Sequence, residues 1–323
     1  MTDQMVTPQT TPSAGAQPVT VQRVSQRGAR TRRRENLYGY LFLIPWLVGF
    51  WGLFAGPAIA SIYFSFTAYE VITPPRWIGT GNYVQMFTRD SLFWPSLWRT
   101  FYYAGVAVPL GVLGSMIVAI LLNAKVRGVT IFRTLFFMPS LVPIVATAVL
   151  FTWLLNTQWG IVNIWIRRMG VHPPGWFTDR RWAIPSLIIM NLWGSIGGTR
   201  MIIFLAGLQG IPDEMYDAAS IDGAGAWARV RTITIPLLTP TIFFNLVLGI
   251  IGALQVFEAA FIATEGGPAF ATWFYGLHLW KHAFDYWNMG YAAALAWFFA
   301  LVIIALTIVQ QRMSTRWVFY YGG

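Results

Sequence analysis

The stretch "YDAASIDGAGAWARVRTITIPLLTP", which runs from Tyr216 to Pro240, stands out in a chain of 323 residues that is 56% hydrophobic and only 11% charged. A soluble globular domain carries about 25% charged residues, so this chain has too few to cover a surface that faces water. Its 17 Trp, 24 Phe and 13 Tyr residues supply rings that settle at membrane interfaces. The sequence therefore predicts a membrane protein in which this polar stretch lies in water between two spans.

The residues at the start of this stretch predict a short helical device. Pro212 suits a first helical position, where its missing N–H is not needed. Asp213 and Glu214 then oppose the positive end of the helix dipole. The helix is expected to stop at Gly223, because glycine readily takes the left-handed conformation that ends helices. A second short helix is expected over about residues 226–232, so the segment would form a knob with small residues at its tip.

Several other stretches are long and apolar enough to cross a membrane, which needs roughly 20 residues per helix. They cover residues 39–68, 100–123, 131–155, 182–207, 237–263 and 288–311. The predicted fold is therefore all-α, with six transmembrane helices in one domain over residues 37–312. An even number of spans places both ends of the chain on the same side of the membrane.

Positive charge gives the expected orientation. The polar segment of residues 1–36 contains Arg23, Arg27, Arg30, Arg32, Arg33 and Arg34. It has almost no large apolar residues to bury, so we expect a disordered tail. Positive residues concentrate on the cytoplasmic side, so both termini are expected there, with residues 313–323 as a short C-terminal tail. The net charge of +10 is then a topology signal, and no nucleic-acid partner is expected.

One group of arginines opposes this orientation, because it falls in an outer loop. It consists of Arg167, Arg168, Arg180 and Arg181. The same loop contains the amphipathic run "GIVNIWIRRMG". A short helix that lies on the outer membrane surface would explain these charges.

Motifs for chemistry are weak or absent. The chain has no Cys, so it has no disulfide and no thiolate metal site. His278 and His282 are four residues apart, but Leu279 stands where a zincin has its glutamate, so we expect interfacial side chains and no metal site. Residues 223–228 fit a dinucleotide fingerprint, yet no strand precedes them. No catalytic residues are expected, since no Ser, His and acid set has a recognisable spacing.

The spacing of residues in the quoted stretch resembles a known signature. The resemblance rests on Asp217, Ala218, Ala219, Asp222, Gly223, Ala224, Ile233, Pro236, Leu238 and Pro240. In this order they resemble the coupling loop of ATP-binding-cassette (ABC) importer permeases: Glu-Ala-Ala, two residues, Asp-Gly-Ala, then spaced Ile, Pro and Pro. Two positions depart, since Asp217 replaces the glutamate and Val230 stands where an aromatic residue is usual. The resemblance implies that residues 212–236 form a cytoplasmic coupling helix that contacts an ATPase.

The resemblance extends over roughly residues 37–312. It is carried by segments such as "WIGTGNYVQMF", "FRTLFFMPSLVPIVATAVLFTWLLN" and "QVFEAAFIATEGGPAFAT". These are similar to the first permease of maltose and glycerol-3-phosphate importers, which implies a type I importer fold in the inner membrane of a prokaryote. The implied partners are a second homologous permease, two copies of a cytoplasmic ABC ATPase and an external solute-binding protein. ATP and Mg would be used by the ATPase, and this chain contains no G-x-x-x-x-G-K-[ST] phosphate loop.

A few polar residues in the predicted spans are candidates for the solute pathway. They are Asn191 and Trp193 in the fourth span and Gln255 and Glu258 in the fifth. Polar groups can bond sugar hydroxyls and aromatic rings can cover sugar faces, and in relatives the spans next to the coupling loop line the solute site. The alternative that these side chains only hold helices together stays open. Arg200 is expected to snorkel to the inner end of its span, although an intramembrane charge is also a candidate functional residue.

The sequence thus predicts a sugar or polyol permease that binds no cofactor and contacts membrane lipid. A self-sufficient secondary transporter, driven by an ion gradient, is the main alternative. Such carriers often use midplane carboxylates, but only Glu258 is a candidate here and the polar knob would have no role. A membrane enzyme is the third class, and it lacks any catalytic constellation.

Overall fold

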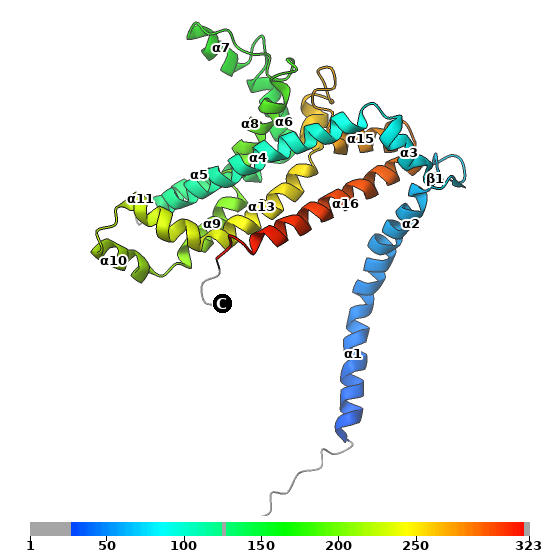
Figure 1. Ribbon diagram of the computed structural model, residues 1–323, viewed down its shortest axis with the longest axis horizontal. Coiled ribbons are helices and arrows are strands. Elements are labelled where there is room, and N and C mark those ends of the chain that lie inside the picture. Colours follow the sequence, from blue (N-terminus) through cyan, green and yellow to red (C-terminus); the bar gives the residue numbers. More distant parts are fainter. Residues whose placement is uncertain (1–26, 125–126, 320–323) are drawn as a thin grey trace, which may run out of the picture. The chain divides into compact units, whose positions relative to one another are not determined.

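The computed structural model describes residues 27–124 and 127–319, and nearly all of its regular structure is helical (Figure 1). The chain divides into two compact units, residues 1–59 and 60–323. The first contains α1 (Arg27–Gly49), the π-helical η1 (Phe50–Ala55) and the start of α2 (Gly56–Ser65). The helix begins at Arg27, within the segment that the sequence assigns to a disordered tail. The rest of that tail, residues 1–26, lies outside the described residues.

The second unit contains one two-stranded hairpin and otherwise consists of helices. Strands β1 (Thr67–Ala68) and β2 (Arg76–Trp77) pair antiparallel. Two helices follow, α3 (Gly81–Thr88) and the long α4 (Phe93–Leu122). The remaining helices are α5 (Val129–Phe137), η2 (Met138–Leu141), α6 (Ile144–Leu154), α7 (Ile161–Arg168), α8 (Ala183–Ser195), α9 (Thr199–Gln209), α10 (Asp213–Ile221), α11 (Ala226–Arg229), η3 (Val230–Thr234), α12 (Ile235–Leu237), α13 (Thr239–Leu254), α14 (Glu258–Ala263), α15 (Tyr275–Trp280), η4 (Lys281–Asp285) and α16 (Met289–Ser314).

The apolar helices give six spans if each bent pair crosses the membrane once. Three helical runs are long and apolar enough alone: Tyr38–Ser65, Phe93–Leu122 and Met289–Ser314. Three pairs qualify together but bend by 95°, 48° and 64°: Val129–Leu141 with Ile144–Leu154, Ala183–Ser195 with Thr199–Gln209, and Ala226–Leu237 with Thr239–Leu254. The fifth span needs a correction, since the sequence predicts it as far as residue 263 but α13 ends at Leu254.

Small residues let other helices approach α4 closely. Its buried stripe includes Ala104, Ala107, Val108, Gly111, Val112, Ser115 and Ala119. Helices α8, α9 and α13 pack against α4. Small side chains at helical spacing permit such contact where lipid gives no hydrophobic drive for association. The hydroxyl of Ser115 also donates across the interface to the carbonyl oxygen of Ser195, at 3.2 Å.

The two ends of α4 carry different structures. Helices α10 and α11 lie near one end of α4 in Figure 1, whereas α3 and α15 lie near the other. Asn123, just after α4, lines a cavity with Tyr216 of α10. Near the first turns of α4, the hydroxyl of Thr100 accepts a hydrogen bond from the N–H of Tyr275 at 2.9 Å. At 1.5 Å per residue this 30-residue helix is about 45 Å long, more than the roughly 30 Å of a bilayer core.

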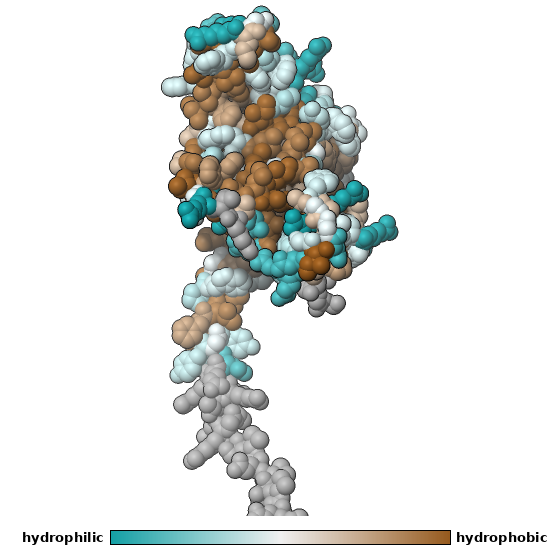
Figure 2. Space-filling model, turned by 90° about the vertical axis from the view of Figure 1, so that its left-hand side faces the viewer, coloured by the Kyte–Doolittle hydropathy of each residue, from teal (hydrophilic) through white to brown (hydrophobic). Residues whose placement is uncertain are grey.

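The outer surface of the second unit is apolar where a soluble protein would be polar. Figure 2 shows a broad hydrophobic area on one face, with hydrophilic residues gathered at its upper and lower margins. On α5 the exposed residues include Ile131, Phe132, Leu135 and Phe136. An exposed apolar area of this kind suits contact with lipid or with another apolar protein surface.

The arginine-rich loop contains the short helix that the sequence predicts. Helix α7 ends in Arg167 and Arg168. Arg167 donates to the carbonyl oxygens of Thr157 and Gln158, and the Arg168 guanidinium lies 5.4 Å from the ring centre of Trp165. The position of α7 on the outer membrane surface stays a prediction.

Candidate functional site

A polar cavity of about 460 Å³ lies among the helices of the second unit. It is lined by Tyr103, Ala107, Val108, Ile144, Asn191, Arg200, Gly252, Ala253, Gln255, Val256, Phe257, Glu258 and Ala259. Three of the four expected pathway residues, Asn191, Gln255 and Glu258, are therefore brought together. The cavity floor is buried, since Tyr103 is 2% exposed, whereas Gln255 and Glu258 are exposed.

Trp193, the fourth expected pathway residue, lies elsewhere. It lines a separate apolar cavity of about 390 Å³ with residues of α5 such as Phe132 and Phe136. Its ring meets Phe151 edge-on, with 5.7 Å between the ring centroids. Two residues along an α-helix correspond to a rotation of roughly 200°, so Trp193 and Asn191 point to different sides of α8.

A break in the fifth span places Gln255 and Glu258 in the cavity. Helix α13 ends at Leu254 and α14 begins at Glu258, so the intervening residues are not helical. The backbone of α15 packs closely against this break. A Cβ atom placed on Gly276 of α15 would lie only 3.0 Å from the carbonyl oxygen of Val256. Irregular backbone at membrane depth is tolerated where it lines a cavity.

Arg200 enters the cavity from a second break. Residues 196–198 separate α8 from α9, and Arg200 is the second residue of α9. Its Nη1 atom is shielded from solvent and has no hydrogen-bond partner. The guanidinium lies against the backbone of Gly111 and Gly249. Arg200 therefore turns into the helical bundle, which corrects the prediction that it snorkels to the end of its span.

The segment expected to couple to an ATPase has the predicted helix, turn and helix. Pro212 caps α10, one position before its first helical residue. The helix stops at Gly223, whose φ of +78° is the left-handed conformation that the sequence predicts. The N–H of Ala224 then donates to the carbonyl oxygen of Ala219 at 2.8 Å. After the turn, α11 continues through η3 and α12, so the second helix is longer than residues 226–232.

The tip of this segment is exposed and its base is fixed. The exposed residues include Asp217, Ala218, Asp222 and Gly223, while Ala219, Ala224 and Pro236 are half-buried. At the base, the hydroxyls of Tyr216 and Thr234 are 3.0 Å apart, which ties α10 to η3. Two large apolar residues at the tip, Ile221 and Trp227, were not predicted and are 88% and 75% exposed. Exposed apolar side chains on a polar knob are typical of a contact surface.

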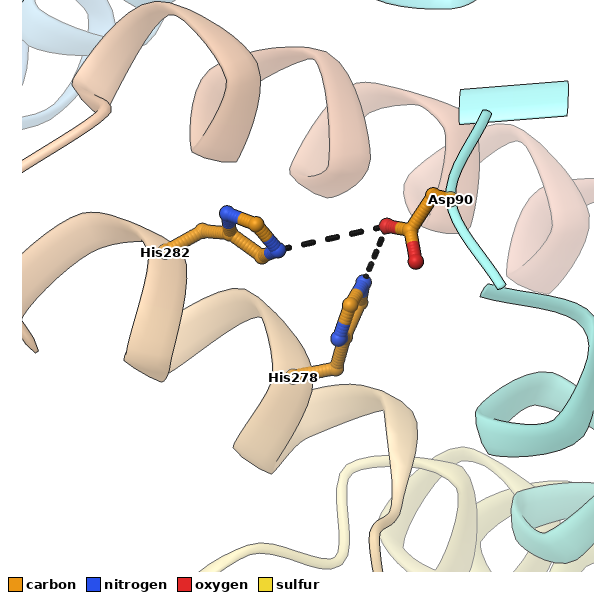
Figure 3. Close-up of side chains that lie close together, drawn as sticks. All are labelled: Asp90, His278 and His282. Carbon is orange, nitrogen blue, oxygen red and sulfur yellow. Dashed lines mark hydrogen bonds and ion pairs between the residues drawn. The ribbon is translucent and has the colours of Figure 1, made fainter. Parts of the chain in front are cut away.

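A second cluster, at the other end of α4, was missed by the sequence analysis (Figure 3). His278 Nε2 lies 2.7 Å from Oδ2 of Asp90, and His282 Nε2 lies 3.9 Å from the same oxygen. The hydroxyl of Tyr291 also donates to Oδ2, at 2.6 Å. His278 is only 2% exposed, so the prediction of an interfacial side chain is wrong for it. Asp90 and His278 are 188 positions apart, and no local pattern could have paired them.

The surroundings of this cluster shift the acidity of its members. Burial alone would raise the pKa of Asp90, but hydrogen bonds from His278 and Tyr291 hold that pKa well below its usual range. Burial and, to a lesser degree, the neighbouring His278 lower the pKa of His282 to about 4, although the Asp90 carboxylate opposes both. The Asp90 carboxylate is thus charged, and His282 is neutral, at physiological pH.

Comparison with known proteins places these features in a family. Residues 107–318 match the family described as binding-protein-dependent transport system inner membrane component. The chain is 38% identical over 300 residues to the probable ABC transporter permease protein YesP of Bacillus subtilis (strain 168), over 92% of this chain and 96% of that protein. It is 33% identical over 286 residues to the lactose transport system permease protein LacF of Rhizobium radiobacter, over 86% and 94%.

The fold is found in a solved structure as well. A chain in the crystal structure of a bacterial ABC transporter involved in import of alginate superposes with a TM-score of 0.79 and 24% identity, over 90% of this chain and 99% of that chain. A bundle of apolar spans with a polar cavity and a protruding polar segment is consistent with a membrane permease, and the family match establishes that class. The chain belongs to the family of inner-membrane components of binding-protein-dependent transport systems, which are ABC importer permeases. The expected type I importer fold is confirmed, and the chain is a transport subunit rather than an enzyme.

Proposed function

We propose that this chain forms half of the translocation pathway of an ATP-driven, binding-protein-dependent importer for a sugar or related polyol. The names of its relatives support the solute class. Besides the lactose permease, the chain is 29% identical over 290 residues to the trehalose/maltose transport system permease protein MalF of Thermococcus litoralis, over 88% of this chain and 96% of that protein. The polar cavity lined by Asn191, Gln255 and Glu258 offers hydrogen-bonding groups for hydroxyls.

The proposed assembly contains four further subunits and a membrane. A second homologous permease completes the pathway, and two cytoplasmic ABC ATPases use ATP and Mg. A solute-binding protein delivers the solute from the other side, as in a related alginate transporter that has been crystallised with a periplasmic protein bound to an alginate pentasaccharide. Both termini of the chain would lie in the cytoplasm.

The observation that carries this proposal is the exposed turn at Gly223 on a base that packs into the membrane unit. The partly buried Met215, Tyr216, Ile233 and Leu237 pack onto a core cluster that includes residues of α4, α9 and Leu238. Because α4 and α9 also supply Tyr103 and Arg200 to the cavity, a push on the turn would be transmitted to the cavity wall. In this mechanism the residues 217–240 act as a lever, and the chain carries out no covalent chemistry.

Retention of the ATPase on purification tests the docking step. The substitutions Gly223→Trp and Asp217→Lys put bulk or reversed charge on the exposed turn, and we expect each to abolish retention. Asp285→Lys is the control, because Asp285 is also partly exposed but lies in η4, near the other end of α4. Retention of the ATPase by both turn variants would refute the docking proposal.

The source of energy for uptake distinguishes an ATP-driven importer from a secondary transporter. The purified permease pair is reconstituted in vesicles, and uptake is measured with ATP, ATPase and binding protein or with an ion gradient alone. We expect uptake only in the first condition. Uptake driven by the gradient alone would show that the chain is an ion-coupled carrier.

A further inference from the structure

Arg200 is a half-buried cation that lines the polar cavity and forms no ion pair with another described residue. Its Nη1 atom is shielded from solvent and makes no hydrogen bond. None of the ion pairs among residues 27–124 and 127–319 involves its guanidinium. Taking a charge out of water is costly unless an opposite charge or hydrogen bonds compensate it. The described part of this chain therefore supplies no ion-pair partner for Arg200.

The space around the guanidinium is shaped by two glycines on different helices. A Cβ on Gly111 of α4 would lie 2.6 Å from Nη1, and a Cβ on Gly249 of α13 would lie 3.1 Å from Nη2. Any larger residue at Gly111 would displace the guanidinium, and one at Gly249 would crowd it. The backbones of two helices that line the cavity thus fix the cation where a solute would pass.

The one carboxylate that lines the same cavity does not cancel this charge. Glu258 is exposed, so water screens it, whereas Arg200 is half-buried and its Nη1 is fully shielded. The other polar side chains of the lining are those of Tyr103, Asn191 and Gln255, and none of them carries a charge at neutral pH. The buried floor of the cavity is therefore positive.

We propose that Arg200 makes the importer selective for glycans that carry a negative charge, such as a carboxylate or a sulfonate. This inference rests on the proposed function, since it names the class of solute that the same cavity admits. Guanidinium binds such oxyanions with two parallel hydrogen bonds, which an ammonium or an amide does not reproduce. A neutral glycan offers the guanidinium only hydroxyl oxygens as acceptors, whereas an acidic one also supplies an opposite charge.

The test uses the complete importer in vesicles, with its own binding protein, and compares digalacturonate with its methyl ester. These two solutes differ in charge and little in shape. Uptake of each is measured for the native permease, Arg200→Gln, Arg200→Lys and Arg99→Gln. Arg99 of α4 is the matched control, because it is also a half-buried arginine with an unpartnered Nη1 but does not line the cavity.

We expect the native importer to take up the acid at least about tenfold faster than the ester. Arg200→Gln should remove this preference by slowing uptake of the acid, Arg200→Lys should restore part of it, and Arg99→Gln should leave it unchanged. Equal uptake of acid and ester by the native importer would overturn the proposal, as would an equal loss of both solutes in Arg200→Gln. Binding of neutral glycans alone by the binding protein would also overturn it. By contrast, absence of ATP-dependent glycan uptake of any kind would refute the proposed function itself.

Discussion

The indole Nε1 of Trp273 donates a hydrogen bond to Nδ1 of His278 at 3.1 Å. Since an indole N–H is only a donor, Nδ1 must be the unprotonated nitrogen of the ring. The proton then lies on Nε2, which donates to Oδ2 of Asp90. Trp273 thereby fixes the tautomer of His278 and orients it as a donor to the carboxylate.

The tautomer of His278 determines whether the Asp90 cluster is arranged as a metal site or as a hydrogen-bonded connection. Nitrogen and oxygen atoms of Asp90, His278 and His282 lie within 4.8 Å of one another, close enough to suggest a metal site. A metal on Nε2 of His278 would require a proton on Nδ1, which would then face the indole N–H. The cluster is thus arranged as a hydrogen-bonded connection from the loop between α3 and α4 to α15 and α16.

Removing the Trp273 donor should therefore improve metal binding. In Trp273→Phe the Nδ1 atom is free to carry a proton, so we expect zinc affinity at least about tenfold higher than in the native protein. Isothermal titration of the purified permease with zinc measures this. Tight zinc binding by the native protein that His278→Ala abolishes would contradict the assigned tautomer.

Breaking the cluster should destabilise the packing of the α3–α4 loop against α15 and α16. Asp90→Ala leaves the buried donors of His278 and Tyr291 without an acceptor, at a cost of about 1–3 kcal/mol for each. It also removes the acceptor for the N–H groups of Leu92 and Phe93 where α4 begins. Thermal unfolding in detergent should show a clear decrease in Tm. The control Asp285→Ala removes a pair with Lys281 that is partly exposed, and it should change stability by less than about 1 kcal/mol.

The packing around η4 should loosen in acid. His282 of η4 has a pKa of about 4 when η4 is folded against 6.5 when η4 is unfolded, so the unfolded segment binds a proton that the folded one does not. Stability from this residue is complete above pH 6.5 and falls as the pH decreases toward 4. The stability that Asp90 contributes is complete above the ordinary pKa of 3.8 and is lost only below it, because its folded pKa lies lower still, so Asp90 adds nothing to the change between pH 7 and pH 4.5. Hydrogen exchange in residues 281–288 should therefore accelerate between pH 7 and pH 4.5 after correction for intrinsic rates, and His282→Asn should flatten this dependence.

The sequence predicted features that depend on local chemistry and missed those that depend on contact at a distance. The end of α10 at Gly223 could be predicted because it depends only on the backbone conformation of that residue, whose φ is +78°. The approximate lengths of the spans follow from runs of apolar residues. The Asp90 cluster forms only when the loop between α3 and α4 meets α15 and α16, which are far apart from it in sequence. The break after Leu254 also escaped prediction, since it depends on Gly276 from α15 packing against Val256.

The stability of the turn at Gly223 should decrease when a single methyl group is added there, although the described residues leave space for it. No atom of the described residues lies within 4 Å of a Cβ placed there, so the cost of Gly223→Ala, about 1 kcal/mol, comes from the left-handed backbone alone. Gly225 has equally open surroundings but a φ of −66°, so Gly225→Ala should be neutral. Hydrogen exchange in α10 compares the two variants. Equal protection in both would show that the turn does not require a positive φ.

The glycines around Arg200 give an independent measure of its role. Gly111→Ala should displace the guanidinium, since the new Cβ would lie 2.6 Å from Nη1, and we expect uptake to decrease at least about tenfold. Gly105→Ala on the same helix has no atom within 4 Å of the new Cβ and should leave uptake unchanged. Normal uptake by Gly111→Ala would show that the position of the cation is not critical.

The double substitution Gln255→Ala and Glu258→Ala tests whether the solute passes through the cavity. Both side chains are exposed on the wall formed by the break in the fifth span, and within residues 27–124 and 127–319 neither side chain forms a hydrogen bond to another helix. Their loss should therefore spare the packing of α13 against α4. We expect uptake to fall while co-purification of the partner permease and the ATPase is unchanged. Trp193→Ala is the matched comparison, because Trp193 lines the apolar cavity beside α5. Normal uptake by the double variant would remove both residues from the pathway, whereas loss of assembly would show that they hold helices together.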